Sequence, residues 1–153
     1  MENTLSIISL IISMITGIFA LGTFFWTASR DRKQATLDAY NALQEQALDH
    51  LNHYMPKAIE DIALHPRSDE YKTISAYIAR IEHFCVGVNR GIYDREVIYD
   101  LAHGYLDEAI KNRITPLIAR KNKNGHDYYV NIHRLYSWME KCAVKEKRKE
   151  DKT

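Results

Sequence analysis

A chain of 153 residues has room for one membrane helix and one domain with a modest core, which excludes large multidomain enzymes. Its 21 Lys and Arg residues nearly balance its 20 Asp and Glu residues, so the net charge of +1 indicates no class of partner. No metal-ligand spacing, nucleophile motif or phosphate-binding glycine loop is present. We therefore expect a non-enzymatic protein that uses neither a metal nor a cofactor and does not bind DNA.

The first feature along the chain is an uncharged run from Asn3 to Ser29. This run is long enough to cross the hydrocarbon core of a bilayer, and it is too long and lacks the leading positive charge for a signal peptide. Arg30, Arg32 and Lys33 follow it, and no Lys or Arg precedes it. The positive-inside rule then predicts a single-pass protein of the inner (cell) membrane, with its N-terminus outside and the rest in the cytoplasm.

Small and hydroxyl-bearing residues recur along this run at alternating steps of three and four. Such spacing places them on one side of a helix, where small residues allow close approach and hydroxyls bond between helices in lipid. We call this set the seam and expect it to hold a homo-oligomer together: Ser6, Ser9, Ser13, Thr16, Ala20 and Thr23. The alternative is that these hydroxyls bond only to carbonyls of their own helix.

The rest of the chain has helical periodicity and no alternating strand pattern, so we expect an all-α fold. The membrane helix continues as a stalk toward Pro56, because no breaker intervenes. Ser68 is an expected N-cap, Gly91 an expected C-terminal cap, and Asp94 the N-cap of the next helix. Thr115 and Pro116 are expected to begin a short segment, and Asp127 the last helix. The resulting divisions are a transmembrane segment (1–29), a helical ligand-binding domain (30–143) and a charged flexible tail (144–153).

A basic segment from Lys111 to His126 contains five cations and no acid, and two tyrosines follow it. Cations beside aromatic rings suit the phosphates and bases of a nucleotide. A polar turn with Asn89 and Arg90 supplies outer contacts. A solvated loop, or contact with anionic lipid headgroups, are the alternatives. The candidate ligand-binding residues are Asn89, Arg90, Arg120, Lys121, Lys123, His126 and Tyr128.

Two resemblances extend this interpretation. The stretch IEHFCVGVNRGIYDREVIYDLAHGYL (81–106), with ITPLIARKN and LYSWMEK further on, resembles an uncharacterised bacterial family that has one N-terminal membrane helix and a small helical domain. The layout and the basic segment also resemble the single-span membrane effectors of type III CRISPR antiviral defence. That second resemblance implies binding of a cyclic oligoadenylate, a tetramer, and disturbance of the membrane.

The function we expect from the sequence is therefore a membrane-anchored antiviral effector. A cyclic nucleotide messenger, with cyclic tetra-adenylate as the first choice, binds the cytoplasmic domain, and the oligomer opens a pore or disrupts the bilayer. One alternative is a membrane-tethered ribonuclease, because Arg120 and His126 match the loose Arg–His spacing of the HEPN ribonucleases. The other is a passive scaffold that docks a protein partner.

Overall fold

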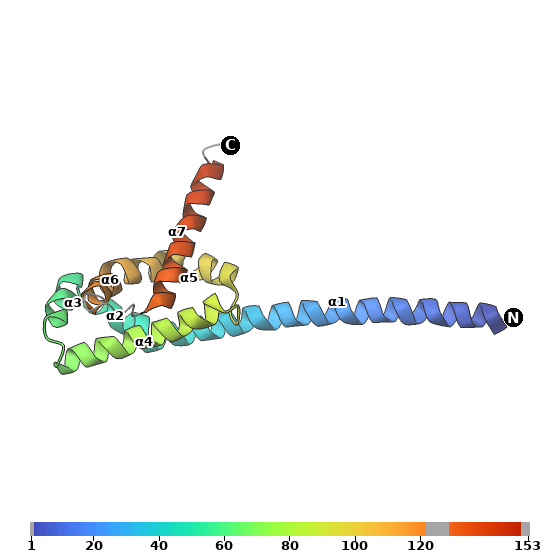
Figure 1. The fold of residues 1–153 in the computed structure, drawn as a ribbon, viewed down its shortest axis with the longest axis horizontal. Coiled ribbons are helices and arrows are strands. Elements are labelled where there is room, and N and C mark those ends of the chain that lie inside the picture. The colour runs from blue at the N-terminus through green and yellow to red at the C-terminus, as the bar shows by residue number, and fades with distance from the viewer. Residues whose placement is uncertain (1, 122–128, 151–153) are drawn as a thin grey trace.

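The computed structural model describes residues 2–121 and 129–150, except for the side chains of residues 2–6, 8 and 119–121. Within these ranges every element is a helix and no strand occurs, which confirms the all-α prediction. Figure 1 shows a helical domain at one end and a long helix that extends from it to the N-terminus.

The long helix begins in the apolar run and ends inside the domain. Helix α1 (Glu2–Leu43) continues without interruption through a π-helical turn, η1 (Gln44–Leu48), into α2 (Asp49–Asn52). Its apolar part is long enough to cross a membrane and none of it is buried by the domain. The Gln46 carbonyl in this π turn accepts from Arg80 Nη1 of α4 at 3.0 Å. The predicted stalk is thus one continuous helical rod.

Two helices follow the stalk, and their ends match the predicted caps. Helix α3 (Pro56–Ala63) starts with its proline, and α4 (Asp69–Asn89) starts after Ser68, whose Oγ accepts from the Tyr71 amide at 3.1 Å. At the other end of α4, Gly91 has φ +74°. The amide of Ile92 donates to the Gly87 carbonyl at 2.9 Å, and that of Gly91 to the Val88 carbonyl at 3.1 Å. These two bonds form a Schellman motif, which turns the chain sharply after α4.

The segment after the turn is more continuous than the sequence suggests. Helix α5 (Arg95–Ala109) passes through a second π turn, η2 (Ile110–Ile114), into α6 (Thr115–Lys121). A short helix does begin at Thr115, as predicted, but no break precedes it. Thr115 is itself helical and its hydroxyl donates back to the Ile110 carbonyl at 2.8 Å, so it is not an N-cap. Pro116 has no amide to donate, and the π turn before it absorbs the missing bond without ending the helix.

The last helix, α7 (Val130–Glu150), leaves the domain at a steep angle to α1 (Figure 1). Most of the segment that we expected to be a tail is helical, since α7 runs to Glu150, although residues 144–150 are all exposed. The expected start at Asp127 lies outside the described residues.

The core lies where the C-terminal part of α1, the turn η1 and helices α2 to α7 meet. Tyr40 and Leu43 of α1 are buried in it, so the stalk is part of the core. Cys85 is a free thiol inside α4, and burial together with the Glu82 carboxylate raises its pKa well above the ordinary range. The largest wholly buried side chains are Leu48, Leu51, Ile59, Ile74, Ile78, Ile81, Ile98, Leu106, Ile110, Ile114, Leu117 and Ile118.

Candidate functional site

Five of the seven predicted ligand residues lie at the end of α6 or in the segment that follows it. Lys123, His126 and Tyr128 lie outside the described residues, and so do the side chains of Arg120 and Lys121. The Arg–His pair expected of a HEPN ribonuclease lies outside them as well. Within the described part of the chain, no group of His, Cys, Asp and Glu residues could hold a metal ion.

The two outer contacts predicted from the sequence, Asn89 and Arg90, lie side by side at the end of α4. The Asn89 side chain is already engaged, since its Nδ2 donates to the Asn131 carbonyl at 2.9 Å and its Oδ1 accepts from Arg95 at 3.3 Å. The Arg90 side chain is exposed and forms no hydrogen bond or ion pair with the described part of the chain. Of the two, Arg90 is the side chain free to contact a ligand.

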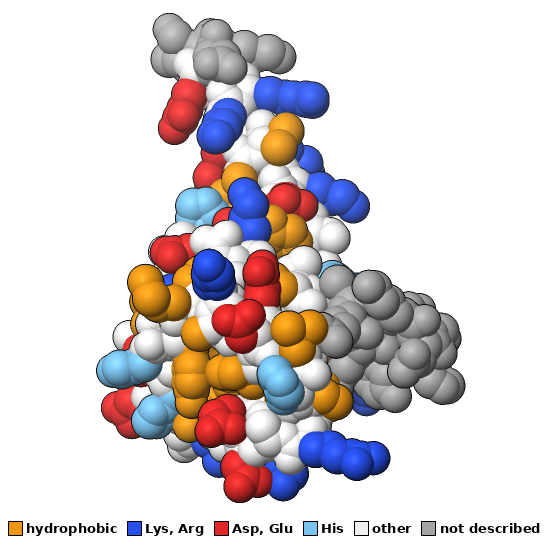
Figure 2. Space-filling model, turned by 90° about the vertical axis from the view of Figure 1, so that its left-hand side faces the viewer, with side chains coloured by type: hydrophobic (Ala, Val, Ile, Leu, Met, Phe, Trp, Pro, Cys, Tyr) orange, Lys and Arg blue, Asp and Glu red, His pale blue; other side chains and the backbone are white. Residues whose placement is uncertain are grey.

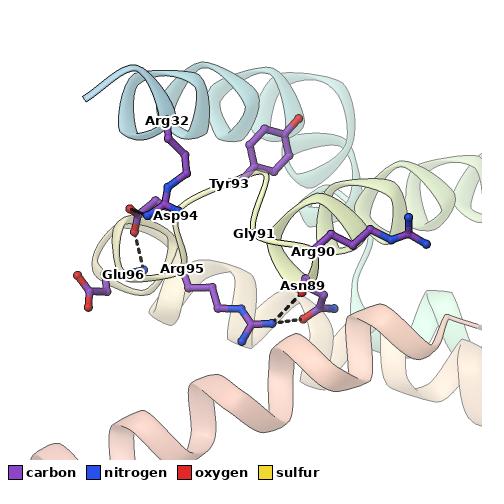
Figure 3. A pocket seen from close by; sticks show the side chains of 8 residues that line it. All are labelled: Arg32, Asn89, Arg90, Gly91, Tyr93, Asp94, Arg95 and Glu96. Carbon is purple, nitrogen blue, oxygen red and sulfur yellow. Dashed lines mark hydrogen bonds and ion pairs between the residues drawn. The ribbon is translucent and has the colours of Figure 1, made fainter. Parts of the chain in front are cut away.

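These residues border a cleft of about 520 Å³ between α1 and the α4–α5 turn (Figure 3). We call it the arginine cleft because three arginines line it, from three different helices or their ends. By contrast, acidic and basic side chains are mixed over the opposite end of the domain, which Figure 2 shows. The residues lining the arginine cleft are Arg32, Asn89, Arg90, Gly91, Tyr93, Asp94, Arg95 and Glu96.

Asp94 joins α1 to the cleft through both its side chain and its backbone. Its Oδ2 accepts from Arg32 Nη2 at 3.0 Å, and its Oδ1 accepts from the amides of Glu96 at 3.0 Å and Val97 at 3.4 Å. Its own amide donates to Thr36 Oγ1 at 2.8 Å. The expected N-cap is confirmed, and the pairing with α1 adds a connection that the cap alone does not require.

This environment also sets the ionisation of Asp94. Burial acts to raise the pKa of its carboxyl, but the hydrogen bonds from Arg32 and the two amides, with the charge of Arg32, outweigh it and lower the pKa. Asp94 is therefore ionised at neutral pH, and its ion pair with Arg32 is the one that joins α1 to the rest of the chain among the described residues.

Arg95 is held in place by the end of α4. Its Nε donates to the Val88 carbonyl at 3.3 Å, which also accepts from the Gly91 amide, and its Nη2 donates to the Asn89 carbonyl at 3.2 Å at the end of the helix. The guanidinium also lies over the Trp138 ring at 5.8 Å. These contacts fix one cation of the cleft, whereas Arg90 can move.

Two glycines shape the turn. Gly91 adopts the left-handed conformation, and a Cβ built on it would meet only open space. Gly87 has the opposite role, because a Cβ there would overlap the Tyr93 ring. That close approach lets Tyr93 stack on Phe84, with ring centroids 5.3 Å apart. Tyr93 thus anchors the turn against α4.

Glu82 ties α7 to the same end of α4. Its Oε1 and Oε2 accept from the amides of Asn131 at 3.1 Å and Ile132 at 2.9 Å. A carboxylate at a helix N-terminus is favoured because the first amides have no partner within the helix. The chain that returns from the basic segment is thereby fixed beside Asn89, through Asn131.

The seam lies on the exposed part of α1. Thr16 and Thr23 each donate to a carbonyl of their own helix, those of Ile12 and Phe19, both at 2.8 Å, as the alternative interpretation predicts for such hydroxyls. The side chains of Ser9 and Ser13 are exposed, and that of Ser6 lies outside the described residues. Oligomerisation through the seam stays a prediction.

The sequence did not single out Arg32 or Arg95 as parts of a site. Arg32 was interpreted only as a topology signal after the apolar run. Arg95 follows an N-cap, where nothing local reveals that it reaches back to α4. The signals that did indicate this region are the cap residues Gly91 and Asp94 and the predicted outer contacts Asn89 and Arg90.

These features define a small all-α protein with one N-terminal helix able to span a membrane and an arginine-lined cleft where that helix enters the domain. The chain belongs to the family described as "Domain of unknown function (DUF4760)", whose model matches residues 8–138. Comparisons with curated proteins and with solved structures gave no match.

Proposed function

We propose that this protein is a single-span membrane effector without catalytic activity, whose helical domain binds a phosphate-bearing ligand in the cytoplasm. The N-terminus lies outside, because the cations Arg30, Arg32 and Lys33 directly follow the apolar run and none precedes it. In bacteria, the membrane is then the inner (cell) membrane.

The continuity of α1 is the observation that carries this proposal. The same helix that can span the membrane contributes Tyr40 and Leu43 to the core of the domain. A change in how the domain packs on these residues therefore moves the membrane helix directly, with no flexible linker to absorb the movement. A ligand shifts such an equilibrium by its difference in affinity for the two packings.

The ligand we favour is a cyclic oligoadenylate, with cyclic tetra-adenylate first. The basic segment offers Arg120, Lys121, Lys123 and His126 for phosphates and Tyr128 for stacking on a base. A cyclic ligand has a rotational symmetry that a ring of identical subunits matches. The anchoring of the chain beside Asn89 through Asn131 supports a site at this end of the domain.

The orientation of the seam supports a homo-oligomer, for which we favour a tetramer. Thr36, Tyr40 and Leu43 are buried against the domain, and each follows a seam-face residue, Thr16, Ala20 or Thr23, by 20 residues. At about 100° per residue, 20 residues amount to about 200°, so the two sets lie on nearly opposite sides of α1. The seams of several subunits can therefore meet without the domains colliding.

The first test is a calorimetric titration of the full chain in lipid nanodiscs with cyclic di- to hexa-adenylates and linear controls. We expect selective binding that Lys121→Glu with Lys123→Glu abolishes. The matched pair Lys145→Glu with Lys147→Glu, on exposed positions of α7, should leave it unchanged. If none of these nucleotides binds, the proposal of a ligand-binding effector is rejected and the passive scaffold is the interpretation that remains. RNA cleavage that disappears with His126→Ala would instead establish a ribonuclease.

A second test separates signalling from anchoring. Ser9→Leu with Ser13→Leu should abolish ligand-dependent dye release from liposomes, since it fills the close-packed seam. Ile11→Leu with Ile15→Leu alters the other side of α1 and should retain release. Equal behaviour of the two pairs would mean that the seam has no role in the membrane effect.

A further inference from the structure

The arginine cleft contains more positive charge than its own carboxylates neutralise. Both oxygens of Asp94 are used, one by Arg32 and the other by two backbone amides. Glu96 also lines the cleft, so two carboxylates face three guanidinium groups there. The Arg90 side chain has no partner in the described part of the chain, and the Arg32 side chain is 49% exposed. The cleft can therefore accept an anion.

The cations differ in mobility in a way that suits a ligand site. Arg95 is fixed by the carbonyls of Val88 and Asn89 and by Trp138. Arg90 extends outward from the turn (Figure 3), and nothing described holds it there. Gly91 between them leaves open space where a side chain would project. A guanidinium presents paired donors that match phosphate oxygens.

The place of the cleft along α1 defines where the phosphate can come from. Arg32 and Thr36 contact Asp94, and they follow the end of the apolar run at Ser29 by three and seven residues. At 1.5 Å per residue, they lie about 5 to 10 Å beyond it, which is the depth of the headgroup layer. A phosphate at this depth belongs either to a phospholipid or to a soluble nucleotide.

We propose that the arginine cleft is a phosphate-binding site in which a bound phosphate, held by Arg90 and Arg32, competes with Asp94 for Arg32. The Asp94 carboxylate and the phosphate repel one another, so binding loosens the contact between α1 and the α4–α5 turn. The cleft thus links phosphate occupancy to the freedom of the membrane helix. The soluble-ligand form of this inference rests on the proposed function, whereas the lipid form does not.

The test measures amide hydrogen exchange of the full chain in nanodiscs, in the peptide around Asp94, whose amide is bonded to Thr36. In one arm, inorganic pyrophosphate or cyclic tetra-adenylate is added to phosphatidylcholine discs. In the other arm, phosphatidic acid is included in the discs and no soluble ligand is added. Faster exchange around Asp94 in the first arm identifies a soluble phosphate, and in the second arm a lipid phosphate.

Arg90→Gln should remove the increase, or shift the half-maximal ligand concentration at least about tenfold, because it deletes a charged donor without a structural partner. Arg67→Gln, exposed in the α3–α4 connection, is the matched control and should change neither. The proposal of a phosphate site is overturned if the exchange stays constant in both arms, or if Arg90→Gln and Arg67→Gln respond equally. If nucleotide binding depends on Lys121 and Lys123 but not on Arg90, the proposed function stands and the cleft fails. If only phosphatidic acid increases the exchange around Asp94, the cleft is a phosphate site for lipid and the soluble nucleotide is not its ligand.

Discussion

Asp94 supplies the sharpest test of how α1 is held to the domain, because one side chain performs two separable tasks. Its Oδ1 caps α5 and its Oδ2 pairs with Arg32. Asp94→Asn keeps a good N-cap but removes the negative charge, whereas Asp94→Ala removes both functions. The difference between the two variants therefore isolates the cap, and the loss in the Asn variant isolates the ion pair.

The expected magnitudes follow from the geometry. Replacing an N-cap carboxylate by Ala costs about 1 kcal/mol. The pair with Arg32 is worth about 0.5 to 1 kcal/mol, since Arg32 is half exposed and its charge is screened by solvent. We therefore expect losses of about 1 kcal/mol for Asp94→Asn and about 2 kcal/mol for Asp94→Ala.

Thermal unfolding of the full chain in nanodiscs, followed by circular dichroism, measures both losses. One kcal/mol corresponds to about 2 to 4 °C in Tm for a chain of this size. A double-mutant cycle with Arg32→Gln should show coupling, so that Arg32→Gln costs little once Asp94 is Asn. Asp61→Asn, at an exposed position of α3, is the control. Equal losses for Asn and Ala, or additive effects with Arg32→Gln, would refute this account of the junction.

The pH dependence of the same variants has a defined sign. The pKa of Asp94 in the folded protein is below the ordinary value of an aspartate, so its contribution to stability is fully present above that ordinary value. It is lost as the pH falls through the lower, folded pKa. The stability advantage of the wild-type chain over Asp94→Asn should therefore be constant near neutrality and disappear only in acid below about pH 4. An advantage that changes between pH 6 and 8 would contradict this assignment.

Three further predictions concern neighbouring contacts. Gly87→Ala should destabilise the domain by about 1 to 3 kcal/mol in thermal unfolding, because its methyl group overlaps the Tyr93 ring. Glu82→Ala should cost about 2 kcal/mol and Glu82→Gln less, since the carboxylate accepts from two amides at the start of α7; equal losses would deny a charge effect. The bond from Tyr99 to Glu146, with burial, raises the pKa of Tyr99 to about 12, so its stabilising effect is present below pH 10 and lost toward pH 12. Tyr99→Phe should speed amide exchange in residues 143–150 at neutral pH, and unchanged exchange there would show that this bond does not hold α7.

The sequence was informative wherever local chemistry determines the structure. Caps such as Ser68, Gly91 and Asp94 act over a few residues, so their positions predict where α4 begins and ends and where α5 begins. The same holds for the stalk, since the segment from Arg30 to Asn52 contains no Pro or Gly that would interrupt the helix.

Local sequence patterns gave incomplete predictions where the structure depends on an unusual helical turn or on a contact between residues far apart in the sequence. Thr115 and Pro116 have the signature of a helix start, but the π turn before them accommodates the proline within a continuous helix. Arg32 and Asp94 are 62 residues apart, and no pattern in one segment specifies its partner in another. Asn89 was expected to face a ligand, and its bond to Asn131 became visible only once α4 and α7 were placed together.

The face of α1 that carries the seam also carries charge below the membrane, which yields a last prediction. Asp31 and Asp38 follow Ser13 and Ala20 by 18 residues, which is five helical turns, so they lie directly in line with the seam. Both are exposed, and the only partner described for either is Gln34, which donates to Asp38 at 3.0 Å. In a parallel oligomer these carboxylates approach their copies, so they oppose the association that the seam favours.

Asp31→Asn with Asp38→Asn should therefore raise the oligomeric fraction measured by energy transfer between labelled subunits at low salt. The gain should shrink above about 0.1 M salt, where screening acts within about 10 Å. The control pair Glu60→Gln with Asp61→Asn removes the same charge from α3 and should have no effect. An oligomeric fraction that is unchanged or lower in the stalk variant would mean that the seams do not meet with the stalks parallel.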